Sequence, residues 1–137
     1  RNIAVGSEVV VSSTSEKWAD HGEGPPKNLV DGDVETRWSS KYEAPQIVTL
    51  DLGTLAELAQ LRLHWEASAA LEYSVKVSKD GKNWEMVNTI LNNEAGPRVD
   101  EVALDGKQAR YVRLKMNKRL NTDFGFSLYE IQVLAYE

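Results

Sequence analysis

Short segments in which apolar and polar residues alternate recur along the chain. In Leu61–Glu66 every second residue is apolar, and Tyr73–Ser78, Val112–Met116 and Ile131–Val133 show the same alternation. A period of two places successive side chains on opposite faces of a β-strand, so one face of each segment is expected to be buried. The pattern predicts that the buried positions include Leu61, Leu63, Trp65, Val75, Val77, Val112, Leu114, Ile131 and Val133.

Turn-forming residues separate these segments. Lys79–Asn83 contains an Asp-Gly pair between Tyr73–Ser78 and Trp84–Val87, which predicts a β-hairpin. Ile47–Leu52 predicts a further strand, and no stretch has the period of a long amphipathic helix. The pattern therefore favours an all-β, antiparallel sandwich or barrel with almost no helix.

Three polar segments lack periodicity and are rich in Gly, Pro, Asn and Asp. They are Ser12–Lys27, Asn92–Asp100 and Asn117–Gly125. We expect them to be loops, and loops on a rigid β scaffold commonly carry binding sites. For Trp38, Trp65 and Trp84, a place in the core is favoured over a role as a ligand platform.

Composition narrows the class of protein. The 137 residues match one domain, residues 1–137, and the net charge of −5 argues against nucleic acid or an anionic membrane as a partner. Cysteine is absent, which excludes disulfides and thiol catalysis. The chain begins with Arg1 and shows no leader, so we expect a module taken from a longer, secreted protein.

The segment Val30–Thr36 concentrates carboxylates and a hydroxyl around Gly32. Hard oxygen ligands of this kind suit Ca²⁺, although the segment is not an EF-hand, because the twelfth position counted from Asp31 is Tyr42 instead of Glu. An ordinary acidic surface turn is the alternative interpretation.

Several motifs in order resemble those of discoidin-type (factor V/VIII type C) domains. They are Asn2–Ala4, Val30–Asp33, Thr36–Ser40, Val48–Gly53, Leu63–Glu66, Tyr73–Trp84, Ala109–Leu114 and Ser127–Ile131. Within that superfamily the chain is most similar to family 32 carbohydrate-binding modules of bacterial glycan-active enzymes. The resemblance implies an antiparallel jelly-roll β-sandwich, galactose-binding-domain-like, with a non-catalytic, lectin-like function in a secreted or cell-surface bacterial protein.

The resemblance also implies a structural calcium ion that joins distant parts of the chain. Its ligands would be the side chains of Asp31, Asp33, Thr36 and Glu130 with the main-chain carbonyls of Asn28 and Tyr129.

The sugar site implied by the resemblance lies on loops at one end of the sandwich. Its positions here are Glu16 (or Ser15, one residue before), Arg37, Tyr42, Glu66 and Phe124. An aromatic ring stacks on a pyranose, while Arg and carboxylate groups bind hydroxyls or an amino sugar's ammonium. The motifs are closest to the subgroup that binds chitosan or β-glucan, with departures at Ala69, Phe124 and Phe126, where that subgroup has Tyr.

The predicted partner is therefore a β-linked polysaccharide or oligosaccharide, bound by a monomeric module that targets an attached enzyme. Alternatives are a galactoside-binding lectin module and a discoidin-type phospholipid or protein adhesion module. A membrane-inserting loop would need exposed apolar tips ringed by cations, whereas Ser12–Lys27 offers only Trp18 among mixed charges. Glycosidase activity is disfavoured, because so small a chain leaves little room for a deep cleft beside the sandwich.

Overall fold

The computed structural model describes residues 1–15 and 23–136, so Glu16 lies outside the described residues. These ranges contain β-strands and one short 3-10 helix. The elements are β1 (Glu8–Val11), β2 (Glu23–Gly24), η2 (Pro26–Val30), β3 (Arg37–Ser39), β4 (Gln46–Trp65), β5 (Ala70–Ser78), β6 (Trp84–Leu91), β7 (Arg98–Arg119) and β8 (Ser127–Ala135).

Two long strands, β4 and β7, bend so that each belongs to both layers of a sandwich. Residues 46–51 of β4 pair antiparallel with residues 111–116 of β7, and residues 60–65 of β4 pair with residues 98–103. The register shifts between these blocks, where Gly53 and Gly106 adopt positive φ angles of 81° and 77°. Glycine adopts this backbone without steric cost, which allows the paired strands to turn together.

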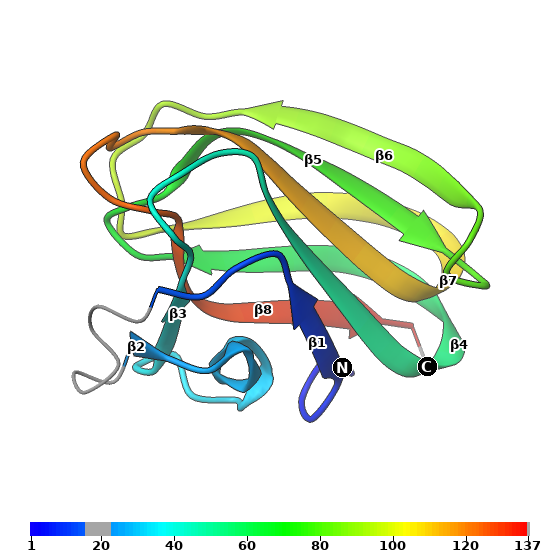
Figure 1. Ribbon diagram of the computed structural model, residues 1–137. Helices are drawn as coiled ribbons and strands as arrows, with labels where there is room; N and C mark the ends of the chain where they lie inside the picture. The colour runs from blue at the N-terminus through cyan, green and yellow to red at the C-terminus, as the bar shows by residue number, and fades with distance from the viewer. Residues whose placement is uncertain (16–22, 137) are drawn as a thin grey trace.

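The hydrogen-bonded path runs β2-β3-β8-β4-β7-β5-β6, with β1 on β4. One layer holds β6, β5 and β1 with the first half of β4 and the second half of β7, while β3 and β8 pair in the other layer (Figure 1). These pairs are antiparallel, and β2 pairs with β3 in parallel. The predicted antiparallel β-sandwich is confirmed, as is the hairpin of β5 and β6.

The core lies between the layers. All nine positions predicted from the alternation are buried. Trp38, Trp65, Tyr73 and Phe126 are the largest buried side chains of the core. The expectation for Trp84 is wrong, because its ring is only half-buried and lies under the Arg113 guanidinium, 4.0 Å from the ring centroid. It belongs to β6, which ends the sheet path and so has a strand neighbour on one side only.

Two of the predicted loops are shorter than expected, because β7 extends from Arg98 to Arg119. Arg98 and Asp100 made this stretch resemble a polar loop. Both side chains are instead buried and joined by a hydrogen bond of 3.0 Å from Arg98 Nε to Asp100 Oδ1. Charged residues enter a strand's inner face when they satisfy one another in this way.

The loops that follow β3, β4 and β7 gather at one end of the sandwich (Figure 1). The two ends of the chain meet elsewhere, where the Ala135 N–H donates to the Arg1 carbonyl at 3.0 Å.

Within the described ranges no helix is long and apolar enough to cross a membrane.

Candidate functional site

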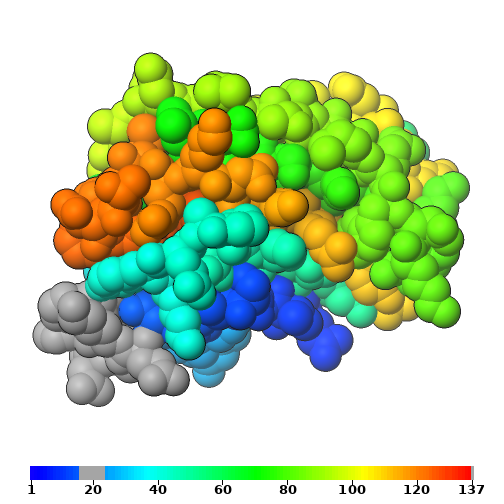
Figure 2. Space-filling model, turned by 45° about the horizontal axis from the view of Figure 1, so that its top comes forward, coloured from blue at the N-terminus to red at the C-terminus, as the bar shows by residue number. Residues whose placement is uncertain are grey.

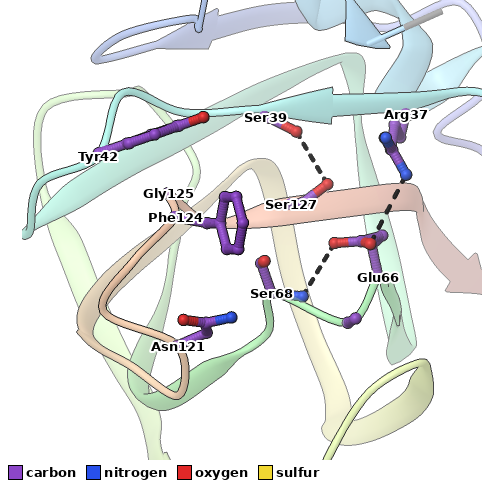
Figure 3. Close-up of a pocket in the computed structure, with 10 residues that line it drawn as sticks. Arg37, Ser39, Tyr42, Glu66, Ser68, Asn121, Phe124, Gly125 and Ser127 are labelled. Atoms are coloured by element: carbon purple, nitrogen blue, oxygen red, sulfur yellow. Dashed lines mark hydrogen bonds and ion pairs between the residues drawn. The ribbon is translucent and has the colours of Figure 1, made fainter. Parts of the chain in front are cut away.

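A pocket of about 490 Å³ opens among these loops (Figure 3). It draws residues from β3, from the loops after β3, β4 and β7, and from the start of β8. The lining residues are Arg37, Ser39, Tyr42, Glu66, Ala67, Ser68, Asn121, Phe124, Gly125 and Ser127. Seen from outside, the loop after β7 (orange) and the loop after β3 (cyan) lie side by side at this end (Figure 2).

One wall of the pocket is aromatic. Tyr42 and Phe124 are 38 % and 44 % exposed, and their rings meet edge to face with centroids 5.9 Å apart. The loops that carry them are linked by backbone pairing, since the Ser40 N–H donates to the Phe126 carbonyl at 2.8 Å. The backbone hydrogen bond between the two loops therefore holds the exposed rings of Tyr42 and Phe124 in place.

A second wall carries an ion pair. Arg37 Nη1 lies 3.6 Å from Glu66 Oε2, with the two side chains 27 % and 21 % exposed. The other carboxylate oxygen of Glu66 accepts the Ser68 N–H at 2.9 Å. Both oxygens of Glu66 thus have partners within the protein, which fixes the carboxylate toward the pocket (Figure 3).

The loop after β4 is supported from behind by Gly96. A Cβ on residue 96 would come 2.2 Å from the Glu66 carbonyl oxygen, so only glycine permits this approach. The Arg98 guanidinium holds the segment that contains Gly96, donating to the carbonyls of Glu94 at 2.6 Å and Ala70 at 2.6 Å.

Asp100 completes this support. Its carboxylate accepts hydrogen bonds from Trp65 Nε1 at 3.0 Å, Tyr73 OH at 2.6 Å and Asn92 Nδ2 at 2.9 Å, besides those from Arg98. Burial and the neighbouring Asp100 charge raise the pKa of Tyr73, which keeps its hydroxyl protonated as the donor. The buried network orders the end of β4 directly before Glu66.

Four of the predicted sugar-site residues, Arg37, Tyr42, Glu66 and Phe124, line this one pocket. Glu16 lies outside the described residues, while the alternative, Ser15, is buried and donates its N–H to the Ser39 carbonyl at 2.8 Å. Two of the positions that depart from the family subgroup, Ala69 and Phe126, are fully buried.

Sequence reasoning missed the smaller polar residues of the pocket. Ser39 Oγ donates to Ser127 Oγ at 2.9 Å, and Ser68 and Asn121 line the side of the pocket below Phe124 in Figure 3. The predicted loop Asn117–Gly125 contained Asn121, but its composition gave no reason to single out one amide.

The acidic turn lies elsewhere, beside β8. Asp31 Oδ2 accepts the Thr36 hydroxyl at 2.5 Å, and the Gly32 N–H donates to Glu130 Oε2 at 2.9 Å. The Asp33 side chain accepts the Glu35 N–H at 2.8 Å. The turn thus brings Asp31, Thr36 and Glu130 together across a large separation in sequence.

Glu130 is fully buried, and its Oε1 has no hydrogen-bond partner among the described residues. Burial, together with the nearby Asp31 and Asp33 carboxylates, raises the pKa of Glu130 to about 8. For Asp31, burial opposes ionisation, but hydrogen bonds from Thr36 and the backbone outweigh it and lower its pKa. Across residues 1–15 and 23–136, no three Asp, Glu or His side chains converge on one metal position.

A bent two-layer sandwich that carries a polar and aromatic pocket on its end loops defines a β-sandwich binding domain. The chain belongs to the F5/8 type C domain family, whose pattern matches residues 9–131. This confirms the family resemblance seen in the sequence motifs.

Solved structures with the same fold come from bacterial glycan-active enzymes. Chitosan-binding module 1 of a chitosanase/glucanase from Paenibacillus sp. IK-5 is 28 % identical, with 98 % of this chain and 99 % of that chain covered and a TM-score of 0.84. Module 2 of the same enzyme, solved in complex with chitotriose, is 28 % identical, with coverage of 98 % and 100 % and a TM-score of 0.85.

A curated relative is the polysaccharide lyase 8 family protein HylA of Enterococcus faecalis. It is 30 % identical over 116 residues, which cover 81 % of this chain and 8 % of the relative. The chain thus spans a small part of that protein's length.

Proposed function

We propose that this domain is a non-catalytic carbohydrate-binding module for a β-linked glycan, an amino-sugar or glucan chain. The observation that carries the proposal is the meeting of an exposed aromatic wall and the Arg37–Glu66 ion pair in one pocket.

Each wall suits one side of a sugar ring. The exposed part of Phe124 offers an apolar surface for the C–H face of a pyranose. The guanidinium of Arg37 donates to ring hydroxyls, and the Glu66 carboxylate accepts from them in charge-assisted hydrogen bonds. A shallow site of this kind desolvates few ligand atoms, so we expect a Kd of about 10 to 100 μM or weaker.

The comparisons support the proposal, because a module of the same fold with 28 % identity was solved with chitotriose. A glycosidase needs two carboxyl groups flanking the scissile bond. Glu66 is the one carboxylate among the described lining residues, and it is paired with Arg37.

The match covers only 8 % of the curated relative, as expected for one module within a much larger protein. In such a protein the module would target the attached enzyme to polysaccharide. We accordingly propose a secreted or cell-surface bacterial parent protein.

A glycan array followed by isothermal titration tests the proposed function. Binding of chitosan or β-glucan oligomers supports it, and selective binding of galactosides would make the domain a galactoside lectin instead. Sedimentation with phosphatidylserine vesicles, without binding to any glycan, would replace the proposal with a lipid-adhesion function.

We further propose a structural Ca²⁺ site at the acidic turn, held by Asp31, Asp33, Thr36 and Glu130 with the carbonyls of Asn28 and Tyr129. The buried, unpartnered Oε1 of Glu130 supports it, since a buried carboxylate oxygen needs a compensating partner. The side chains of Asp31, Asp33 and Glu130 do not converge on one position among the described residues, so the turn would have to draw these carboxylates together around the ion. Carbonyl and hydroxyl oxygens would complete the flexible coordination that Ca²⁺ accepts. The positive charge of the ion would let Glu130 ionise beside Asp31 and Asp33, whose carboxylates otherwise help to raise its pKa.

A further inference from the structure

Among the side chains of the described lining residues, Asn121 Nδ2 and Ser68 Oγ are the polar groups without a hydrogen-bond partner in the protein. Other polar groups are engaged: Ser39 with Ser127, and both carboxylate oxygens of Glu66 with Arg37 and Ser68 N–H. The hydrogen-bonding capacity left for a ligand on the side below Phe124 therefore belongs to Asn121 and Ser68 (Figure 3).

The orientation of the Asn121 amide is fixed by the loop. Its Oδ1 accepts the backbone N–H of Asp123 at 3.0 Å, and a backbone N–H can only meet the oxygen end of the amide. The Nδ2 group of Asn121 is consequently the end of the amide that can donate a hydrogen bond to a ligand. Arg119 steadies the same loop by donating to the carbonyls of Phe124 at 3.1 Å and Thr122 at 3.4 Å.

The Asn121 Nδ2 donor favours a ligand that offers a hydrogen-bond acceptor at this position, and it disfavours a ligand that places a cation there. An ammonium group has hydrogen-bond donors only, so it cannot form a hydrogen bond with Asn121 Nδ2, which is also a donor. The charge of Glu66 is already opposed by Arg37, which reduces the attraction that a carboxylate would otherwise offer to an ammonium. An acetamido group instead offers a carbonyl oxygen, which can accept a hydrogen bond from Nδ2.

On the basis of the proposed glycan-binding function, we propose that Asn121 is a specificity-determining residue that makes the pocket prefer N-acetylated amino sugars to their free-amine forms, with Ser68 as a further contact to the sugar. The acetamido carbonyl accepts from Asn121 Nδ2, and Ser68 Oγ hydrogen-bonds a neighbouring polar group of the same sugar.

The test compares N,N′,N″-triacetylchitotriose with chitotriose by isothermal titration. Wild type is expected to bind the acetylated trisaccharide at least about fivefold more tightly, from one added neutral hydrogen bond. Asn121→Asp keeps an oxygen to accept the Asp123 N–H but replaces the donor with a negatively charged acceptor. It is expected to weaken the acetylated ligand about tenfold and to strengthen chitotriose, so that the preference reverses.

Asn88→Asp, on an exposed position of β6, makes the same charge change outside the pocket and is expected to leave the preference unchanged. Ser68→Ala removes a contact that both trisaccharides share, so it is expected to weaken both and keep the preference. Asn121→Ala, which introduces no charge, removes the Nδ2 donor, is expected to abolish the preference and serves if Asn121→Asp does not fold. Equal binding of both trisaccharides by wild type, or an unchanged preference in Asn121→Asp and Asn121→Ala, would overturn the inference. Binding of laminaritriose alone overturns the inference but keeps the proposed function, whereas binding of no glycan overturns both.

Discussion

Gly125 lies so close to Ser40 that a Cβ on residue 125 would come 2.3 Å from the Ser40 carbonyl oxygen and 2.6 Å from that of Lys41. This contact brings the loop after β7 against the loop after β3, and Phe124 and Tyr42 meet as a result. The shape of the pocket depends on the absence of a side chain at this point.

Gly125→Ala is therefore expected to move the two loops apart. Because backbone atoms are the obstacle, the change should cost about 1 to 3 kcal/mol of unfolding free energy. It should also raise the Kd for glycans about tenfold or more by misplacing Phe124. Urea unfolding and isothermal titration measure the two effects, and unchanged affinity in a folded Gly125→Ala protein would show that the loop contact does not shape the site.

Phe124→Ala should weaken every glycan ligand about tenfold, because it removes the stacking surface and not a hydrogen bond that distinguishes sugars. Phe124 is 44 % exposed, so stability should change by less than about 0.5 kcal/mol. Leu91→Ala on β6, where the side chain is 73 % exposed, is the matched control and should leave affinity unchanged. A ligand-selective loss in Phe124→Ala would assign the ring a recognition role in place of general stacking.

EDTA should lower the melting temperature, since an ion that binds only the folded state stabilises it by about 2.7 kcal/mol at a hundred times its Kd. Asp31→Ala should lower the melting temperature and abolish the EDTA effect, while Glu43→Ala, an exposed carboxylate outside the turn, should keep it. If EDTA and Asp31→Ala both leave the midpoint unchanged, the segment is an ordinary acidic turn.

Calcium binding should also depend on pH. Without the ion, the raised pKa of Glu130, about 8, means that this carboxyl binds a proton at neutral pH. The metal requires the ionised form, so binding at pH 7 should release close to one proton, and the affinity should rise from pH 6 to pH 8. Titrations in buffers of different ionisation enthalpy count the proton.

Asp100→Ala should cost about 3 to 5 kcal/mol, because it leaves the buried Arg98 charge without its carboxylate and removes the acceptor of Trp65 and Tyr73. Urea unfolding measures the loss. Asp51→Ala breaks the more exposed pair with Arg110 and should cost much less. Similar losses for the two variants would contradict the importance assigned to burial.

Asp80 should make the β5–β6 hairpin sensitive to acid. Its pKa is lowered by the backbone N–H groups of Asn83 and Lys82, which donate to the ionised carboxylate. A lowered folded-state pKa means that the stabilisation is complete above the ordinary value of 3.8 and is lost as the pH falls below it. Asp80→Asn should therefore lower the melting temperature at pH 7 but flatten its decline between pH 5 and pH 3, as thermal unfolding across this pH range would show.

The sequence by itself determined the strand-rich, antiparallel nature of the fold and the buried face of its main strands. Alternation in Leu61–Trp65 and Val112–Met116 requires one buried face in each strand, and the Asp-Gly turn requires a hairpin, because both follow from local backbone geometry. The family motifs also named Arg37, Tyr42, Glu66 and Phe124, which share one pocket.

Only the tertiary structure decided the rest. The sequence predicted a loop around Arg98 and Asp100, but their mutual hydrogen bond allows both side chains to be buried in the fold. It also predicted a buried Trp84, but this residue lies on β6, the strand at the end of the sheet path. Asn121 lines a pocket built by segments far apart in the chain. The physical reason is that burial, pairing and the free end of an amide depend on long-range contacts, which no local pattern of residues encodes.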